Sequence, residues 1–159
     1  MKLFFSTFRN KVDKKGRVSV PASFRSVLKV RDSGHDFTGV IVYPSFVKNC
    51  LVAGGMSHME SIIESVELMD EYSEERDAFE TSIFGGSKEV QFDSEGRILL
   101  SKQLMEEAGI EDLAVFVGKG SNFEIWSPER FAKHEGEAKK IAAEKKGMLG
   151  IGRRTKDAN

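Results

Sequence analysis

Two stretches of the sequence, 80 residues apart, each place an arginine four positions after an aspartate. They read VDKKGRV at residues 12–18 and FDSEGRI at residues 92–98. Glycine readily adopts the left-handed conformation that closes a short hairpin loop, and the aspartate can pair with the arginine across that loop. The pattern therefore predicts two pinned hairpin turns, formed by Asp13, Gly16 and Arg17 in the first copy and by Asp93, Gly96 and Arg97 in the second.

The first copy carries more positive charge than a hairpin needs. Lysine and arginine on a β-hairpin can contact phosphates, and arginine can also read guanine in the major groove. We therefore expect DNA contact here, with Arg17 touching a base or a phosphate; an ordinary solvated face is the alternative. The predicted DNA-binding residues, which should gather around the first loop and the helix beside it, are Arg9, Lys11, Lys14, Lys15, Arg17 and Arg25.

The second copy keeps the turn but loses the two lysines at its tip. Ser94 and Glu95 stand where the first copy has Lys14 and Lys15. A glutamate repels phosphate, so the second loop is expected to be a poor DNA ligand. Its aspartate and glycine, like those of the first copy, are interpreted mainly as turn-forming residues.

The charge of the whole chain is nearly balanced, but its distribution is not. The formal net charge is −1, yet residues 1–31 hold nine basic residues against one acidic residue, and residues 60–80 hold nine acidic residues against one arginine. Such opposed regions favour a polyanionic partner, although two solvated faces would give the same pattern.

The repeat extends beyond the two loops and predicts the fold class. Each copy reads as strand, turn, strand, helix, strand and strand, which indicates an α+β fold. A half of about 40 residues cannot bury enough surface to stand alone, so the two halves should pack as a pseudo-dimer. The expected divisions are a first repeat at 1–56, acidic connecting helices at 57–86, a second repeat at 87–126, and a C-terminal helix with a basic tail at 127–159.

A helix is expected after each repeat. Ser57 with Glu60 three positions later is typical of a capping box, followed by apolar residues at helical spacing. Ser127 before Pro128 predicts the start of the C-terminal helix in the same way.

The residues that could support catalysis are scattered. His35, His58 and His134 lack metal-ligand spacing, and Cys50 has no second cysteine to form a bridge. We therefore predict no enzymatic activity, no metal, no cofactor and no small-molecule substrate. The lone cysteine, the absence of a signal-peptide core and the absence of a long apolar run favour a soluble cytoplasmic protein that does not enter a membrane.

The residues FFSTFRNKVDKKGRVSVPASFR (4–25), the second Asp-x-x-Gly-Arg loop and FEIW (123–126) together resemble the MraZ family of bacterial transcription regulators. The resemblance implies two fused half-units of the AbrB/SpoVT type, which form a swapped-hairpin β-barrel. It also implies a ring-shaped homo-oligomer in the cytoplasm and nucleoid that displays Asp-x-x-x-Arg loops to double-stranded DNA. Members bind direct repeats upstream of the division and cell-wall gene cluster and generally repress it.

A second class of function stays open at this point. A protein-interaction module with an AbrB-like fold, either antitoxin-like or a purely structural ring, would share the repeat and the hairpins. Its usual hallmark would be a long acidic or disordered tail, whereas the tail here is short and basic.

Overall fold

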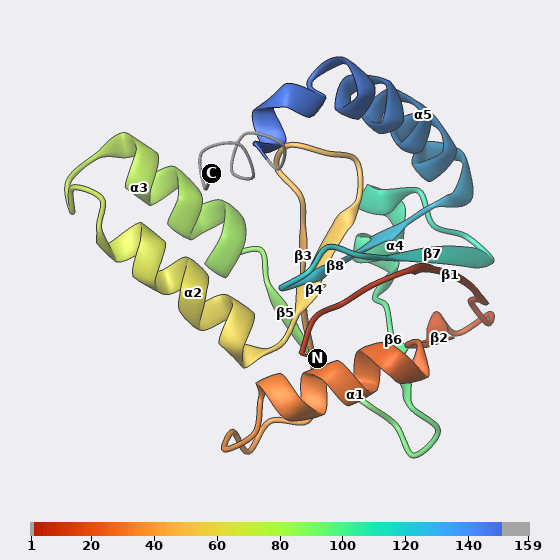
Figure 1. Ribbon diagram of the computed structural model, residues 1–159. Coiled ribbons are helices and arrows are strands. Elements are labelled where there is room, and N and C mark those ends of the chain that lie inside the picture. Colours follow the sequence, from red (N-terminus) through yellow and green to blue (C-terminus); the bar gives the residue numbers. More distant parts are fainter. Residues whose placement is uncertain (1, 151–159) are drawn as a thin grey trace, which may run out of the picture.

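The computed structural model describes residues 2–150 and places helices on both faces of an antiparallel sheet (Figure 1). The α+β class predicted from the repeat is confirmed. The part of the predicted basic tail at 151–159 lies outside the described residues. The strands are β1 (Thr7–Lys11), β2 (Arg17–Ser19), β3 (Gly39–Pro44), β4 (Leu51–Gly54), β5 (Lys88–Gln91), β6 (Arg97–Leu99), β7 (Leu113–Gly118) and β8 (Phe123–Trp126).

The helices follow the predicted order. Within residues 2–150, no helix has the length and apolar character needed to cross a bilayer. The α-helices are α1 (Ala22–Arg31), α2 (Met56–Glu67), α3 (Glu74–Phe79), α4 (Lys102–Ala108) and α5 (Pro128–Glu144), with a π-helical segment at Glu80–Phe84 and a 3-10 turn at Lys146–Leu149.

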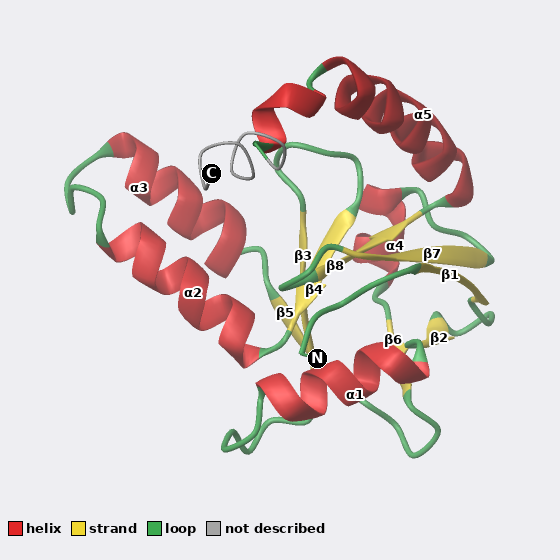
Figure 2. Cartoon of the chain, viewed as in Figure 1, coloured by secondary structure: helices red, strands yellow, loops and turns green. Residues whose placement is uncertain are grey.

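Each half of the chain supplies an edge strand to the other half. The six-stranded sheet has the order β1-β7-β8-β4-β3-β5, so β1 pairs with β7 of the second half and β5 pairs with β3 of the first half. The short strands β2 and β6 form a separate two-stranded ribbon. Figure 2 shows this ribbon beside the loops that lead out of β1 and β5.

The pairing register repeats in the two halves. Phe8 lies opposite Phe116, the fourth residue of β7. Its counterpart 80 residues later, Lys88, lies opposite Val42, the fourth residue of β3. In the ribbon, Val18 lies opposite Ile98, its own counterpart in the repeat. The two halves are therefore related by a pseudo-twofold axis that passes through the ribbon.

The sheet does not close into the predicted barrel. Strand pairing in the sheet ends at β1 and β5. The chain leaves β1 through Val12, which bridges to Val18, and continues through the loop into the ribbon. The sheet therefore stays open among the described residues.

Both faces of the sheet are covered by apolar contacts. The main core lies between the sheet, the ribbon and helices α1 and α4, and its aromatic centre includes Phe24, whose ring meets the rings of Phe4 and Phe123 at centroid distances of 5.4 and 4.9 Å. The other face is covered by α2 and the π-helical segment on one half and by α5 on the other. Helices α2 and α3 lie side by side (Figure 1). The acidic residues of 60–80 are exposed, apart from the half-buried Glu80.

The predicted capping box at Ser57 is wrong. Helix α2 begins at Met56, and its first amides are capped by a residue distant in sequence: the two carboxylate oxygens of Asp32 accept hydrogen bonds from the amides of Met56 and Ser57 at 3.1 Å each. The hydroxyl of Ser57 is buried without a hydrogen-bond partner among the described residues. The close approach of Asp32 requires a glycine at position 55, since a Cβ there would stand 2.0 Å from its Oδ2.

Replacing Asp32 should therefore destabilise the fold, whereas replacing Ser57 should not. We expect Asp32→Ala to lower the free energy of unfolding by about 1–2 kcal/mol, the usual loss when a cap is removed. Ser57→Ala removes a buried hydroxyl that has no partner and should be neutral or stabilising. Urea unfolding of the two variants measures both effects, and an equal loss in both would contradict the assignment of the cap.

Candidate nucleic-acid interface

The first loop (residues 13–17) is held together by one aspartate. Oδ1 of Asp13 accepts hydrogen bonds from the amides of Lys15 and Arg17, both at 2.9 Å, and Oδ2 accepts one from Nε of Arg17 at 2.6 Å. The amide of Gly16 closes the turn on the carbonyl of Asp13 at 3.0 Å. The predicted Asp–Arg pair is confirmed, and the carboxylate in addition orders the loop backbone.

The second loop (residues 93–97) has the same hydrogen bonds. Asp93 accepts from the amides of Glu95 and Arg97 at 2.9 Å and from Nε of Arg97 at 2.8 Å. The second loop lacks the two lysines of the first and still forms the same turn. The geometry of the turn is therefore independent of those lysines. The predicted role of both aspartates in the turn is confirmed.

Each loop is also fastened to the other half of the chain. The carbonyl of Gly16 accepts the amide of Leu100 at 2.9 Å, and the carbonyl of Gly96 accepts the amide of Val20 at 3.2 Å. Both glycines have a positive φ, 90° at Gly16 and 77° at Gly96. A Cβ at Gly16 would lie 2.6 Å from the carbonyl oxygen of Leu100, so glycine is needed for the close approach as well as for the turn.

The two aspartates are held in their charged form. Hydrogen bonds from the arginine backbone amides are the largest cause that lowers the pKa of Asp13 and of Asp93, and the arginine side chains add to it. Hydrogen bonding to Asp93 raises the pKa of Arg97. Each loop therefore combines a fixed carboxylate with a fixed guanidinium at neutral pH.

The two arginines differ in how much of the guanidinium is already engaged. Arg97 donates its Nε to Asp93 and also places Nη2 3.1 Å from a carboxylate oxygen of Glu95. Arg17 uses Nε in the same way, but within residues 2–150 its Nη atoms have no ion-pair or hydrogen-bond partner. Arg17 therefore has two donor atoms left for a ligand.

The structure places most of the predicted DNA-binding residues around the first loop. Arg9 and Lys11 alternate with the partly buried Phe8 and Asn10 along the edge strand β1, and both are exposed. Lys14 and Lys15 are exposed at the tip of the loop.

Arg25 is the exception, because it lies at the second loop rather than the first. Its Nε donates to the carbonyl of Val20, and its guanidinium packs on Gly96, where a Cβ would come within 2.6 Å of Nη1. The counterpart of Arg25 in the repeat is Met105, whose sulfur packs in the same way on Gly16. The expectation that Arg25 joins the first cluster is thus wrong, since each loop is covered by the helix of the opposite half.

Sequence reasoning missed this pairing, although one signal for it was available. If the halves are related by a twofold axis, a helix that follows one loop can pack on the other loop. The ribbon pairing of Arg17 with Leu99 and of Ser19 with Arg97 brings the two loops to one end of the molecule.

Comparison with known proteins gives the family. The family model described as "MraZ protein, putative antitoxin-like" matches residues 83–151, which include the second loop. A protein of Rickettsia canadensis named "Transcriptional regulator MraZ" is 53% identical over 147 residues, which cover 92% of this chain and 95% of that protein. A protein of the same name from Rickettsia akari is 52% identical over 150 residues, 94% of this chain and 97% of that protein.

The chain belongs to the MraZ family. The resemblance found on the two loops and the flanking residues is confirmed, and it extends over most of the chain. MraZ relatives are named as transcriptional regulators, so the prediction that the chain is no enzyme agrees with its family.

The residues considered for catalysis lie at separate places. His35 bonds to Glu60 at 2.6 Å. His58 contacts the Tyr43 hydroxyl, and burial lowers the pKa of this histidine. Burial also raises the pKa of the Cys50 thiol to about 12. His134 stacks on Trp126 with a centroid distance of 4.6 Å.

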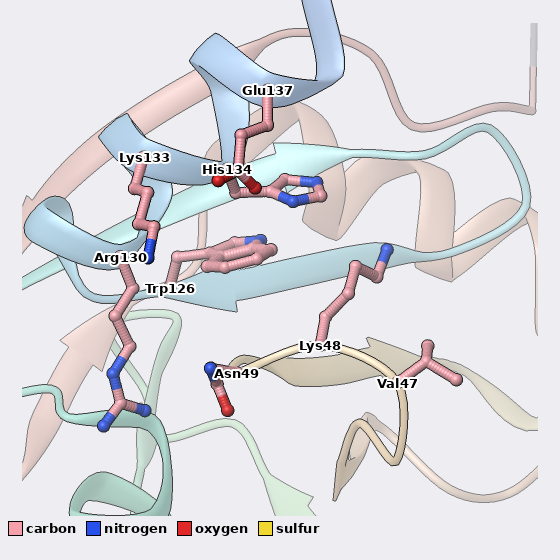
Figure 3. Close-up of a pocket in the computed structure, with 8 residues that line it drawn as sticks. All are labelled: Val47, Lys48, Asn49, Trp126, Arg130, Lys133, His134 and Glu137. Carbon is pink, nitrogen blue, oxygen red and sulfur yellow. The ribbon is translucent and has the colours of Figure 1, made fainter. Parts of the chain in front are cut away.

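Figure 3 shows His134 in a polar pocket of about 330 Å³ between α5 and the β3–β4 loop. Lys48, which lines the pocket, pairs with the buried carboxylate of Glu124, which also accepts Nε1–H of Trp126 at 3.1 Å. A lysine of the β3–β4 loop thus neutralises the buried carboxylate, and removing that lysine would leave a costly unpaired charge.

The carboxylate of Asp13 should control the order of its own loop only. In Asp13→Ala, the amides of Lys15 and Arg17 lose their acceptor, so we expect several-fold faster hydrogen exchange there and no change in the second loop. Asp93→Ala should show the reverse. Faster exchange in both loops after either substitution would contradict two independently pinned turns.

The same carboxylate predicts a pH dependence with a definite sign. Because the folded pKa of Asp13 is lowered, its contribution is complete above the ordinary aspartate value of about 3.9 and is lost as the pH falls through the lowered pKa. The Nε–H resonance of Arg17 should therefore keep its position down to about pH 4 and move only below it.

Proposed function

We propose that the chain is a DNA-binding transcriptional regulator that grips double-stranded DNA with the end of the molecule where the two loops lie. The observation that carries the proposal is the partly unengaged Arg17, which Asp13 holds in place beside exposed lysines. A guanidinium fixed before binding loses little freedom on contact, and its remaining Nη donors suit a phosphate or the edge of a guanine.

Each basic residue has a distinct part in this proposal. Arg17 makes the contact to a base or phosphate, while Lys14 and Lys15 at the loop tip neutralise backbone phosphates. Arg9 and Lys11 extend the positive surface along β1. Such backbone contacts position a protein on the duplex without reading its sequence.

The second loop joins the interface through Arg25. Glu95 alone would repel phosphate, but the guanidinium of Arg25 packs on Gly96 of the same loop. We propose that Arg25 gives the second loop the positive charge that its own sequence lacks. The two loops then offer two unlike contact points to the DNA.

The finer parts of the proposal rest on the family. We infer that the halves are tandem AbrB-like units, a reading that the exchange of edge strands supports. We infer too that the chain forms a homo-oligomeric ring, acts in the cytoplasm at the nucleoid, and represses the division and cell-wall gene cluster. Several weakly binding loops on one ring would then engage successive direct repeats, and multivalency would make the whole contact tight.

The salt dependence of binding tests the role of the lysines. Fluorescence anisotropy with the duplex upstream of the protein's own gene should show a log–log salt slope of about −0.9 per neutralised phosphate. Lys14→Gln with Lys15→Gln should make the slope about 2 units shallower for each engaged loop. The matched control is Lys139→Gln with Lys140→Gln on the exposed face of α5, which should leave the slope unchanged.

The two loop arginines provide the second test. Arg17→Ala should weaken binding about tenfold or more, the scale of a lost charge-assisted contact, while the variant stays folded by circular dichroism. Arg97→Ala removes an arginine already paired with Asp93 and Glu95 and should weaken binding less. Equal losses would contradict the assigned difference between the loops, and an intact oligomer that binds no duplex at low salt would favour the protein-interaction alternative.

A further inference from the structure

A pocket opens beside the second loop. It lies between α1, the α1–β3 connection (residues 32–38) and the second loop, and its volume is about 560 Å³. We call it the α1 pocket. Its size falls within the range of about 300–1,000 Å³ that is usual for small-molecule sites. The residues that matter most for its chemistry are Arg25, Lys29, His35, Phe37, Phe92 and Ser94.

The α1 pocket breaks the symmetry of the repeat. The connection between helix and strand comprises residues 32–38 in the first half, whereas the corresponding connection in the second half is shorter, residues 109–112. The longer connection supplies His35 and Phe37 to the pocket wall. Arg25 is likewise particular to the first half, since Met105 is its counterpart. The second half lacks these features and still forms the same hairpin and sheet register. The fold therefore does not require them.

The α1 pocket is lined by apolar side chains and by two cationic ones. The buried Leu28 and the partly buried rings of Phe37 and Phe92 provide the apolar part. Arg25 and Lys29 provide the positive charge, and within residues 2–150 neither forms an ion pair.

The acidic and histidine groups of the pocket are already engaged. Asp32 accepts the first amides of α2, Asp93 accepts Arg97, and His35 bonds to Glu60. Asp32 keeps its charge, since only amides bond to it, and Asp93 is paired with Arg97; the two cations Arg25 and Lys29 therefore exceed the one carboxylate that is left. A ligand that matches the lining therefore has an apolar body and an anionic head.

We propose that the α1 pocket binds a small amphiphilic anion, an apolar body bearing one carboxylate, phosphate or sulfonate group, and that this ligand competes with DNA for Arg25. The competition rests on the proposed DNA-binding function; the pocket itself does not. Asp93, Ser94 and Gly96 of the second loop form one wall, and the Arg25 guanidinium lies on Gly96. A ligand that engages Arg25 thus withdraws it from phosphate and lowers the affinity for DNA. By linkage, bound DNA must lower the affinity for the ligand by the same factor.

The probe for the test is 8-anilinonaphthalene-1-sulfonate, a fluorescent anion with an apolar ring system. We expect the full chain to bind it, and Arg25→Gln and Lys29→Gln each to weaken binding about tenfold, as for a lost charge-assisted hydrogen bond. Ser33→Phe should fill the α1 pocket and abolish binding. Ser65→Phe, which adds the same ring to the exposed face of α2, is the matched control and should have no effect.

A second control addresses binding of the probe to other apolar surface. The groove near the N-terminus, lined by Leu3, Phe5, Phe8 and Val30, also exposes apolar side chains but has no cation among its lining residues. Phe5→Ser should leave the fluorescence titration unchanged. Binding that is lost in Phe5→Ser and kept in both Arg25→Gln and Ser33→Phe would overturn the proposal.

The link to DNA is tested separately. Saturating probe should weaken duplex binding by wild-type chain but not by Ser33→Phe, which keeps Arg25 and all loop lysines. If the probe requires Arg25 and the pocket but leaves duplex affinity unchanged, the competition is wrong. If the chain binds no duplex at all while the probe still requires Arg25, the proposed function fails and the pocket stands.

Discussion

The structure depends on the fact that neither half of the chain can complete its own sheet. Strand β1 needs β7, β5 needs β3, and the ribbon forms only when β2 meets β6. The apolar core also joins the two halves, since Phe24 of the first half packs against Phe123 of the second. Unpaired, each half would expose strand edges and the apolar face of its helix, so the halves are stable only together. The exchange also brings the two loops to one end of the molecule.

Within this symmetric frame, the loops are alike in backbone and unlike in side chains. Asp13 and Asp93 make the same hydrogen bonds to backbone amides, which fix the turn without requiring particular side chains at the two tip positions. Those positions could therefore diverge at little structural cost, to lysines in one copy and to Ser94 and Glu95 in the other. The same holds for the residue that covers each glycine, Arg25 in one case and Met105 in the other.

What could be predicted from the sequence was local. The order of strands and helices, the Asp–Arg pairs and the cap at Ser127 involve residues at most a few positions apart, where turn and capping chemistry decides the outcome. The cap of α2 by Asp32 and the packing of Arg25 on Gly96 could not be read in this way. Both join residues that only the fold brings together, and Ser57 offered a plausible local cap that the structure does not use. The open sheet was missed for the same reason, since closure depends on the path of both edge strands.

The departures from symmetry share one feature: polar side chains of the first half contact residues of the second half. Val52 and Glu124 lie opposite each other where the pseudo-twofold axis crosses the sheet, an apolar residue facing a buried carboxylate. A lone buried carboxylate is costly, and Lys48 from the β3–β4 loop compensates it. Arg25 of the first half likewise reaches the second half, where its guanidinium packs on Gly96 of the second loop. Glu124 of the second half is thus neutralised by Lys48 of the first, whereas Asp93 and Glu95 pair with Arg97 of their own half. The contact at Glu124 makes the two copies complementary and no longer interchangeable.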